Sequence, residues 1–280
     1  MARQDALSIY VNDNDLDKLS ELYGEVIESI QKICVSEQIK NKNYSGTPTS
    51  GSVEIDRFKN ATIDDLGTAR TGGAGKNIKN TGKVTVNIDT DKEIVEELAW
   101  KDIELYGVAG MAERRKNNHV KRMSAYLDTQ FFATAVSEGT GVDLSSYNTI
   151  AEKVEALIQS VETTVNDWVD GVDRDMLVIT VTPAIYGELL NYIDNVPNSI
   201  SGLTDTYFHK VRIFSNHRQT KDIICMIDGA VAQPVVAKQY DVEKIQLSPN
   251  IALELFFSKG TKAVMPDLIK YSNNTVSGTV

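Results

Sequence analysis

The sequence predicts an α+β fold organised around one long helix. Residues 111–138 carry apolar side chains at the three-and-four spacing of a helix with one buried face. Before this helix, two runs of alternating apolar and polar residues flank a glycine-rich stretch, which predicts a β-ribbon with a long tip. After the helix, further helix and strand patterns predict a compact mixed region that closes with strands near residue 271. The chain shows no internal repeat.

Composition limits the classes of protein that fit. At 280 residues the chain can form two subdomains, each with its own core. Its 41% hydrophobic and 24% charged residues are typical of a folded protein and argue against disorder. The net charge of −10 argues against a protein whose main task is to neutralise a nucleic-acid backbone, because that task needs clustered Lys and Arg.

The cysteines and the N-terminal residues indicate the compartment. Cys34 and Cys225 have no metal-ligand or redox spacing around them, so we expect two buried free thiols in a reducing environment. Residues 1–18 contain no apolar run typical of a signal peptide, and no later segment is long enough to span a bilayer. We therefore expect synthesis in a cytoplasm.

An arm and an amphipathic helix are expected before the ribbon. Residues 1–12 alternate like an extended arm, and Asp13 or Asp15 can then cap a helix that reaches about Ile39. Such a helix must dock its apolar face. Packing on its own domain is the favoured interpretation, and docking on a neighbouring subunit is the alternative.

The ribbon itself is predicted over residues 52–89, with a long tip at 66–77. The tip resembles a phosphate-binding loop only superficially. Arg70 stands where the Walker pattern requires glycine, and Asn77 stands where it requires Ser or Thr. Its glycines are better explained by flexibility. A ribbon with little core of its own should be mobile unless a partner subunit holds it.

Two faces are predicted for the long helix. The buried face comprises Val120, Met123, Leu127, Phe131 and Ala135, with Thr134 on the same stripe. The opposite face carries Arg114, Arg115, Lys116, Lys121 and Arg122, and a solvated basic face is its default interpretation.

The remaining chain predicts a second subdomain. Asn148 or Thr149 caps a helix whose apolar stripe runs to Trp168. A buried strand at 176–181, a helix opened by Pro183, and strands at 211–214 and 223–227 follow. The end of the chain predicts a hairpin, with residues 251–258 returning through 263–265.

Candidate catalytic residues are few. His119, His209 and His217 do not pair with Cys, Asp or Glu at metal-ligand spacing, and His119 falls within the basic face of the long helix. No HExxH motif or nucleophile elbow is present. Pairs such as Glu96 with Glu97 are unremarkable in an acidic protein, so a structural role is favoured. A hydrolase whose carboxylates come together from distant positions stays as the alternative from another class.

The order of these parts, with the segments DIELYGVAGMAERRKNNHVKRMSAYLDTQFFATAVSEG and ELFFSKGTKAVMPDLIKY, resembles the major capsid proteins of tailed bacteriophages with the Hong Kong 97-like fold. The resemblance divides the chain into five parts. They are an N-terminal arm and first helix at 1–51, an extended loop at 52–90, a peripheral domain with the spine helix at 91–146, an axial domain at 147–235, and closing peripheral strands with a tail at 236–280.

The resemblance implies a structural protein without enzyme activity, cofactor or metal. Its copies would form pentamers and hexamers in an icosahedral shell around viral double-stranded DNA, assembled in the host bacterial cytoplasm and located in the virion. Scaffold, portal and decoration proteins are implied as further partners. About fifty residues precede the ribbon, which implies a separate scaffold or none. A cross-linking lysine of the family cannot be matched here to Lys59, Lys76, Lys79 or Lys83. An encapsulin, which encloses a cargo enzyme, is the nearest alternative.

The family likeness also implies which residues join subunits. The ribbon's apolar side chains would gain burial on a neighbouring subunit, and its charges would pair across that interface. The apolar candidates are Val53, Ile55, Val84, Val86 and Ile88, and the charged candidates are Arg57, Lys59, Asp64, Asp65, Arg70, Lys76, Lys79 and Lys83.

Overall fold

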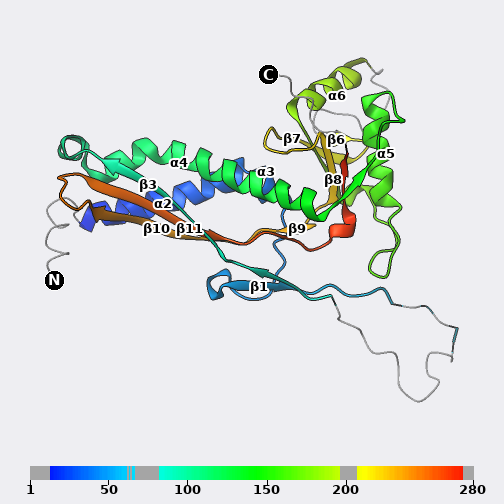
Figure 1. Ribbon diagram of the computed structural model, residues 1–280, viewed down its shortest axis with the longest axis horizontal. Coiled ribbons are helices and arrows are strands. Elements are labelled where there is room, and N and C mark those ends of the chain that lie inside the picture. Colours follow the sequence, from blue (N-terminus) through cyan, green and yellow to red (C-terminus); the bar gives the residue numbers. More distant parts are fainter. Residues whose placement is uncertain (1–12, 62, 64, 67–81, 196–206, 274–280) are drawn as a thin grey trace.

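The computed structural model describes residues 13–61, 63, 65–66, 82–195 and 207–273. The protein has an elongated body, in which a long helix and a twisted sheet run side by side (Figure 1). A second subdomain lies at one end of this body, and a β-ribbon extends beneath it.

The long helix α4, Trp100–Glu138, begins earlier than Met111, where the sequence pattern placed its start. Gly107 interrupts it with φ 71° and ψ 167°, a backbone conformation that glycine adopts most readily. The amide of Trp100 donates to Asn250 Oδ1 at 3.1 Å, which satisfies one of the free donors of the first turn. The predicted core face is confirmed, because Val120, Met123, Leu127, Phe131 and Ala135 are all buried.

A three-stranded antiparallel sheet packs against this helix, in the order β10 (Val235–Lys244), β11 (Ile251–Lys259) and β3 (Thr90–Leu98). Helix α2, Asp13–Ile33, packs against both α4 and the sheet, and the short helix α3, Val35–Ile39, follows it. Leu19 and Val26 of α2 share one core with Leu253 and Leu255 of β11. The first helix thus docks on its own chain, as the favoured interpretation held.

The hairpin predicted near the C-terminus is wrong. Strand β11 pairs with β10 and β3, whereas the returning segment forms β12, Lys262–Ala263, which pairs with β9, Val231–Ala232. The amide of Gly260 donates to the carbonyl of Pro234 at 3.1 Å, so the chain leaves the sheet at this point. Both β11 and β12 therefore pair with other strands and not with each other.

The second subdomain is a six-stranded sheet. Its order is β4 (Thr140–Val142), β13 (Ile269–Ser272), β8 (Ile223–Ile227), β5 (Leu177–Val181), β7 (Val211–Ser215) and β6 (Tyr207–Phe208). Leu177, Ile179 and Val181 face a core shared with α5, Ile150–Glu162, and α6, Pro183–Asn195. Val178 instead packs with Phe131 and Phe132 of α4. Strand β5 is therefore buried on both faces, as its continuous apolar run predicts.

The cap of α5 follows the sequence expectation, but its end does not. Thr149 and Glu152 form a capping box in which each side chain accepts from the other residue's amide. The helix stops at Glu162, so Val165 and Trp168 are not part of its apolar stripe. Short 3₁₀ turns occur at Pro48–Ser50 (η1), Arg174–Met176 (η3) and Pro266–Leu268 (η4).

Buried polar side chains connect the parts. Asp128 of α4 accepts from the Ser36 amide at 3.0 Å and from Arg218 Nη1 at 2.6 Å. His119 is fully buried, contrary to its placement on the basic face, and its Nε2 lies 3.0 Å from Glu96 Oε2. The paired contact explains how an imidazole is accommodated in the core.

Both cysteines are free and buried, as predicted. Among the described residues, no helix combines the length and apolar character needed to cross a bilayer. Within that same part of the chain, no group of three or more His, Cys, Asp or Glu residues is placed to hold a metal ion.

Candidate intersubunit surface

The ribbon consists of β1, Ser52–Ile55, and β2, Val84–Asn87, in antiparallel register with Val53 opposite Val86. Its apolar face is already covered by the chain itself. Val53, Ile55 and Val86 expose only 0%, 6% and 1% of their surface and pack with Ala232 and Val264. Val84 and Ile88 are half-buried, and Val84 joins the same cluster.

The prediction that these apolar residues lie on a neighbouring subunit is therefore wrong for Val53, Ile55 and Val86. The alternation correctly identified an apolar face, but the strand of Ala232 and the segment of Val264 already cover it. These covering residues lie far along the chain, and no local pattern connects them to the ribbon.

Three of the predicted charged contacts also have partners within the chain. Arg57 pairs with Asp267 at 2.6 Å, Lys59 pairs with Asp167 at 2.5 Å, and Lys83 pairs with Glu54. Asp65 lies exposed beyond the ribbon. Asp64, Arg70, Lys76 and Lys79 lie outside the described residues.

Exposed apolar side chains follow the first ribbon strand. Phe58 is 53% exposed, and Ile63 and Leu66 are fully exposed. Large exposed apolar side chains that lie close together along the chain are candidates for a contact surface. Sequence reasoning missed them because they do not alternate, although apolar residues inside an otherwise polar loop were a usable signal.

A tight turn at residues 163–173, which we call the Trp168 turn, lies beside the extended loop where the chain leaves β1 and returns to β2. Asn166 Oδ1 accepts from the amides of Trp168 at 2.8 Å and Val169 at 3.0 Å, a side-chain interaction that fixes such turns. The amide of Gly171 donates to the carbonyl of Thr164 at 3.0 Å, with Gly171 at a positive φ of 78°. The turn therefore has a defined shape.

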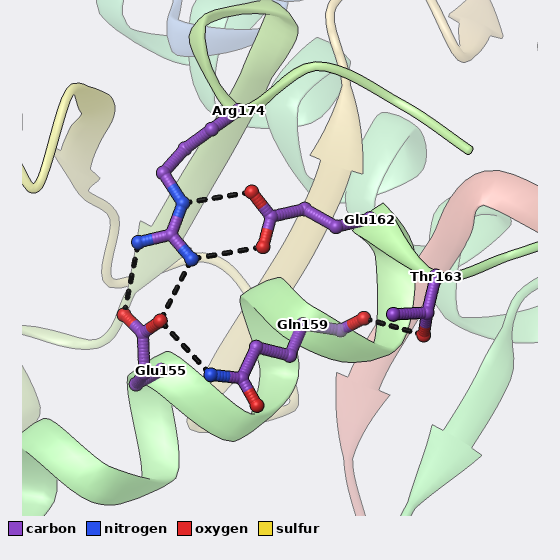
Figure 2. Close-up of polar contacts among 5 residues, drawn as sticks. All are labelled: Glu155, Gln159, Glu162, Thr163 and Arg174. Atoms are coloured by element: carbon purple, nitrogen blue, oxygen red, sulfur yellow. Dashed lines mark hydrogen bonds and ion pairs between the residues drawn. The ribbon is translucent and has the colours of Figure 1, made fainter.

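Arg174 joins the two ends of this turn, as Figure 2 shows. Its guanidinium donates from Nε and Nη2 to both oxygens of Glu162, at 2.7 and 2.8 Å. It also donates to both oxygens of Glu155, at 3.2 and 2.7 Å. The hydrogen bonds to Glu162 and Glu155 raise the pKa of Arg174. Burial alone would raise the pKa of Glu155, but the bonds from Arg174 and Gln159 outweigh it and the pKa is lowered.

The Trp168 ring contacts the extended loop on both sides, just beyond the paired strands. We call the residues that leave β1, 56–61, the outgoing leg, and the residues that lead back to β2, 82–83, the returning leg. Arg57 and Lys59 of the outgoing leg lie over the ring, 5.2 and 5.3 Å from its centroid. On the returning leg, a Cβ built on Gly82 would lie 2.6 Å from the ring. The amide of Asn60 donates to the carbonyl of Asp167 at 2.9 Å. The turn thus contacts the ribbon through an aromatic ring, an ion pair and a backbone hydrogen bond.

Asp267 of η4 completes this contact. It accepts from Arg57 Nη2 at 2.6 Å and from Asn166 Nδ2 at 2.7 Å, so one carboxylate joins the ribbon to the turn. Burial alone would raise the pKa of Asp267. The hydrogen bonds from Arg57 and Asn166 outweigh that effect and hold the pKa below its ordinary value.

A second surface lies on the outer face of the three-stranded sheet. Leu253, Leu255 and Phe257 of β11 point into the core, so the residues between them point the other way. The outer face carries Glu254 and Phe256 of β11 and, opposite them in register, Val95 and Glu93 of β3. Glu97 and Asp91 extend the same row. We call this the acidic sheet face, and sequence reasoning missed it because it did not predict β3 or β10.

No family model and no curated protein matches this sequence. Solved structures match the fold instead. A chain of the cyanophage P-SCSP1u capsid is 11% identical over 85% of this chain and 87% of its own, with a TM-score of 0.62. The chain has the Hong Kong 97-like capsid fold.

Further structures share this fold at low identity. A chain of Mycobacterium phage Che8 is 17% identical, covers 80% of this chain and 84% of its own, and has a TM-score of 0.56. A chain of the virus-like particle from Pyrococcus furiosus is 13% identical, covers 90% of this chain and 98% of its own, and also has a TM-score of 0.56. The predicted fold class is confirmed.

The Hong Kong 97-like fold accounts for the long helix, the sheet beside it and the ribbon. The five predicted part boundaries stay a prediction. One strand from the predicted peripheral closing segment, β13, pairs with β8 of the predicted axial segment and with β4. The six-stranded sheet therefore draws on three of the five predicted parts.

Proposed function

We propose that this chain is a phage major capsid protein, a structural protein without enzyme activity. Many copies would assemble as pentamers and hexamers into an icosahedral shell that encloses double-stranded DNA. The supporting observation is the likeness to the cyanophage capsid chain, which extends over most of both chains. The proposed location is the virion capsid, after assembly in the host bacterial cytoplasm.

The ribbon supplies the proposed contact between copies. Phe58, Ile63 and Leu66 expose apolar area that a neighbouring subunit would bury. Beyond them, residues 67–81 contain Arg70, Lys76 and Lys79 and no acidic residue. Such a segment is complementary to a surface of carboxylates, and charge complementarity favours one orientation of binding over others.

The acidic sheet face is the proposed receiving surface. Glu93, Glu97 and Val95 of β3 are exposed there, and Phe256 provides apolar area between the carboxylates. We propose that the ribbon of one copy lies across this face of the next copy. Each such contact would be weak, but a closed shell repeats it at every subunit.

The net charge of −10 supports a container that does not bind its contents tightly. A basic inner wall would hold DNA through counterion release, whereas an acidic protein leaves it free. We propose non-specific contact with packaged DNA, together with scaffold, portal and decoration proteins as further partners.

A shell around a protein cargo, of the encapsulin type, is the second candidate. The match to the virus-like particle from Pyrococcus furiosus, which covers 98% of that chain, supports it. The phage interpretation is preferred because phage structures recur among the matches. Nuclease-protected DNA inside particles from an infected host would support the capsid, and a co-purifying enzyme would support the encapsulin.

Charge reversal tests the proposed contact. Glu93→Lys with Glu254→Lys on the acidic sheet face should leave a folded chain that sediments as capsomers or monomers. Lys121→Glu, on an exposed position of α4, is the matched control and should assemble like the unmodified chain. If the double variant assembles as well as the Lys121→Glu control and the unmodified chain, the proposed receiving surface is contradicted.

A further inference from the structure

We propose that Trp168 is a positioning residue for the extended loop, and that it sets the direction of the ribbon before any neighbour binds. The inference deepens the proposed function, and its importance for shells rests on that function. Its structural part, the hold of the Trp168 turn on the ribbon, is measurable in the unassembled chain.

The first observation is that one ring touches both legs. Arg57 and Lys59 lie over the Trp168 ring from the outgoing leg, and Gly82 lies against it from the returning leg. A ribbon held at only one leg can swing about that point. Contacts at both legs restrict the swing, because moving either leg separates it from the ring.

The second observation is that polar contacts flank the ring. Lys59 pairs with Asp167, and the Asn60 amide donates to the Asp167 carbonyl. Arg57 pairs with Asp267, which also accepts from Asn166 of the turn. Hydrogen bonds depend on direction, so these contacts fix how the outgoing leg passes the turn.

The third observation is that the turn itself is fixed. Asn166 closes it from within, and Arg174 holds its two ends through Glu162 and Glu155. The turn connects α5 to β5, whose five residues are all buried. Val169 and Val172 of the turn pack against the core of the six-stranded subdomain, so the turn that carries the ring is anchored to that core.

The consequence is a preorganised loop. A segment that already points in its bound direction loses less conformational freedom on binding than one that samples many directions. Phe58, two residues from Asn60, would be presented to a neighbour in a constant orientation. Uniform presentation by every copy favours shells of one size, whereas a loosened ribbon allows several contact angles.

Hydrogen exchange in the unassembled chain tests the hold directly. Trp168→Ala should speed exchange at the Asn60 amide by at least about tenfold, while amides of α5 and β5 keep their protection. Trp168→Phe keeps an aromatic face for Arg57 and Lys59 and should restore most of the protection. Unchanged exchange at Asn60 in Trp168→Ala would overturn the proposal.

Swapping the charges of Lys59 and Asp167 provides a second hydrogen-exchange test if Trp168→Ala does not fold. Lys59→Asp alone and Asp167→Lys alone should each speed exchange at Asn60, and the double variant should recover part of the loss. Absence of recovery, or absence of any effect of the single changes, would overturn the proposal.

Electron microscopy then tests the consequence for assembly. Trp168→Ala should give particles of mixed size and open sheets where the unmodified chain and Trp168→Phe give uniform shells. Uniform shells from Trp168→Ala would overturn this consequence. If the unmodified chain forms no shells or capsomers with or without a scaffold protein, the proposed function fails, and the exchange data still decide whether Trp168 positions the ribbon.

Discussion

Trp168 lies against Gly82 so closely that a Cβ on this glycine would stand 2.6 Å from the indole ring. The ring belongs to the turn between α5 and β5, and the glycine belongs to the returning leg of the ribbon. The missing side chain allows the leg to approach the ring. The same built Cβ would also lie 2.9 Å from the carbonyl oxygen of Arg57 on the other leg.

Gly82→Ala should therefore displace the returning leg. In a Trp100→Phe background Trp168 is the single tryptophan, and we expect its emission to shift to the red as water reaches the ring. Gly24→Ala is the matched control, because a Cβ there meets nothing within 4 Å. An emission spectrum of Gly82→Ala equal to that of the control would refute the close approach.

The hold of the ribbon should weaken in acid. The pKa of Asp267 is lowered in the folded chain from an ordinary value of 3.8, so its contacts with Arg57 and Asn166 are fully present above that value. They are lost as pH falls through the lower folded-state pKa. Trp168 emission in the Trp100→Phe background should report this loss below about pH 4. Asp267→Asn should reduce the change of Trp168 emission with pH. An unreduced change would show that other titrating groups cause it.

Removing the guanidinium of Arg174 should destabilise the second subdomain. Arg174→Met leaves Glu155 and Glu162 close together without their shared partner. We expect a loss of about 2 kcal/mol in the free energy of unfolding, measured by urea denaturation. Lys121→Met, at an exposed position, should change that free energy by less than about 0.5 kcal/mol. Similar values for both variants would contradict the role of Arg174.

The two thiols should be unreactive in the folded chain. Burial, with a smaller contribution from Asp128, raises the pKa of Cys34 to about 12, and burial raises the pKa of Cys225 as well. Titration with dithionitrobenzoate at pH 8 should release nothing before denaturant is added and two equivalents per chain afterwards. Rapid reaction of either thiol in the native chain would show that its core opens readily.

Local patterns predicted the elements better than their pairing. The apolar stripe of α4, the capping box at Thr149 and the apolar run of β5 depend on neighbouring residues, so the sequence alone indicates them. The partners of β11 lie far along the chain in β10 and β3. Neither strand has a clear alternation, and the nearby 263–265 segment therefore looked like the natural partner.

The candidate surface was harder to predict for the same reason. The alternation at Val53 and Ile55 indicates an apolar face but not which residues cover it. In the structure Ala232 and Val264 pack against this face. Trp168 continues the apolar spacing of α5 in the sequence. The helix nevertheless ends at Glu162, and Trp168 lies in the turn that follows it. Its contact with Gly82 joins segments that no pattern relates.

Electron microscopy of the purified recombinant protein, with sedimentation of the same sample, decides whether this chain forms a shell. We expect closed particles, or rings of five and six subunits that close when a scaffold protein is supplied. A monomer or dimer at every concentration, with and without scaffold, would contradict the assignment of this chain as a shell protein.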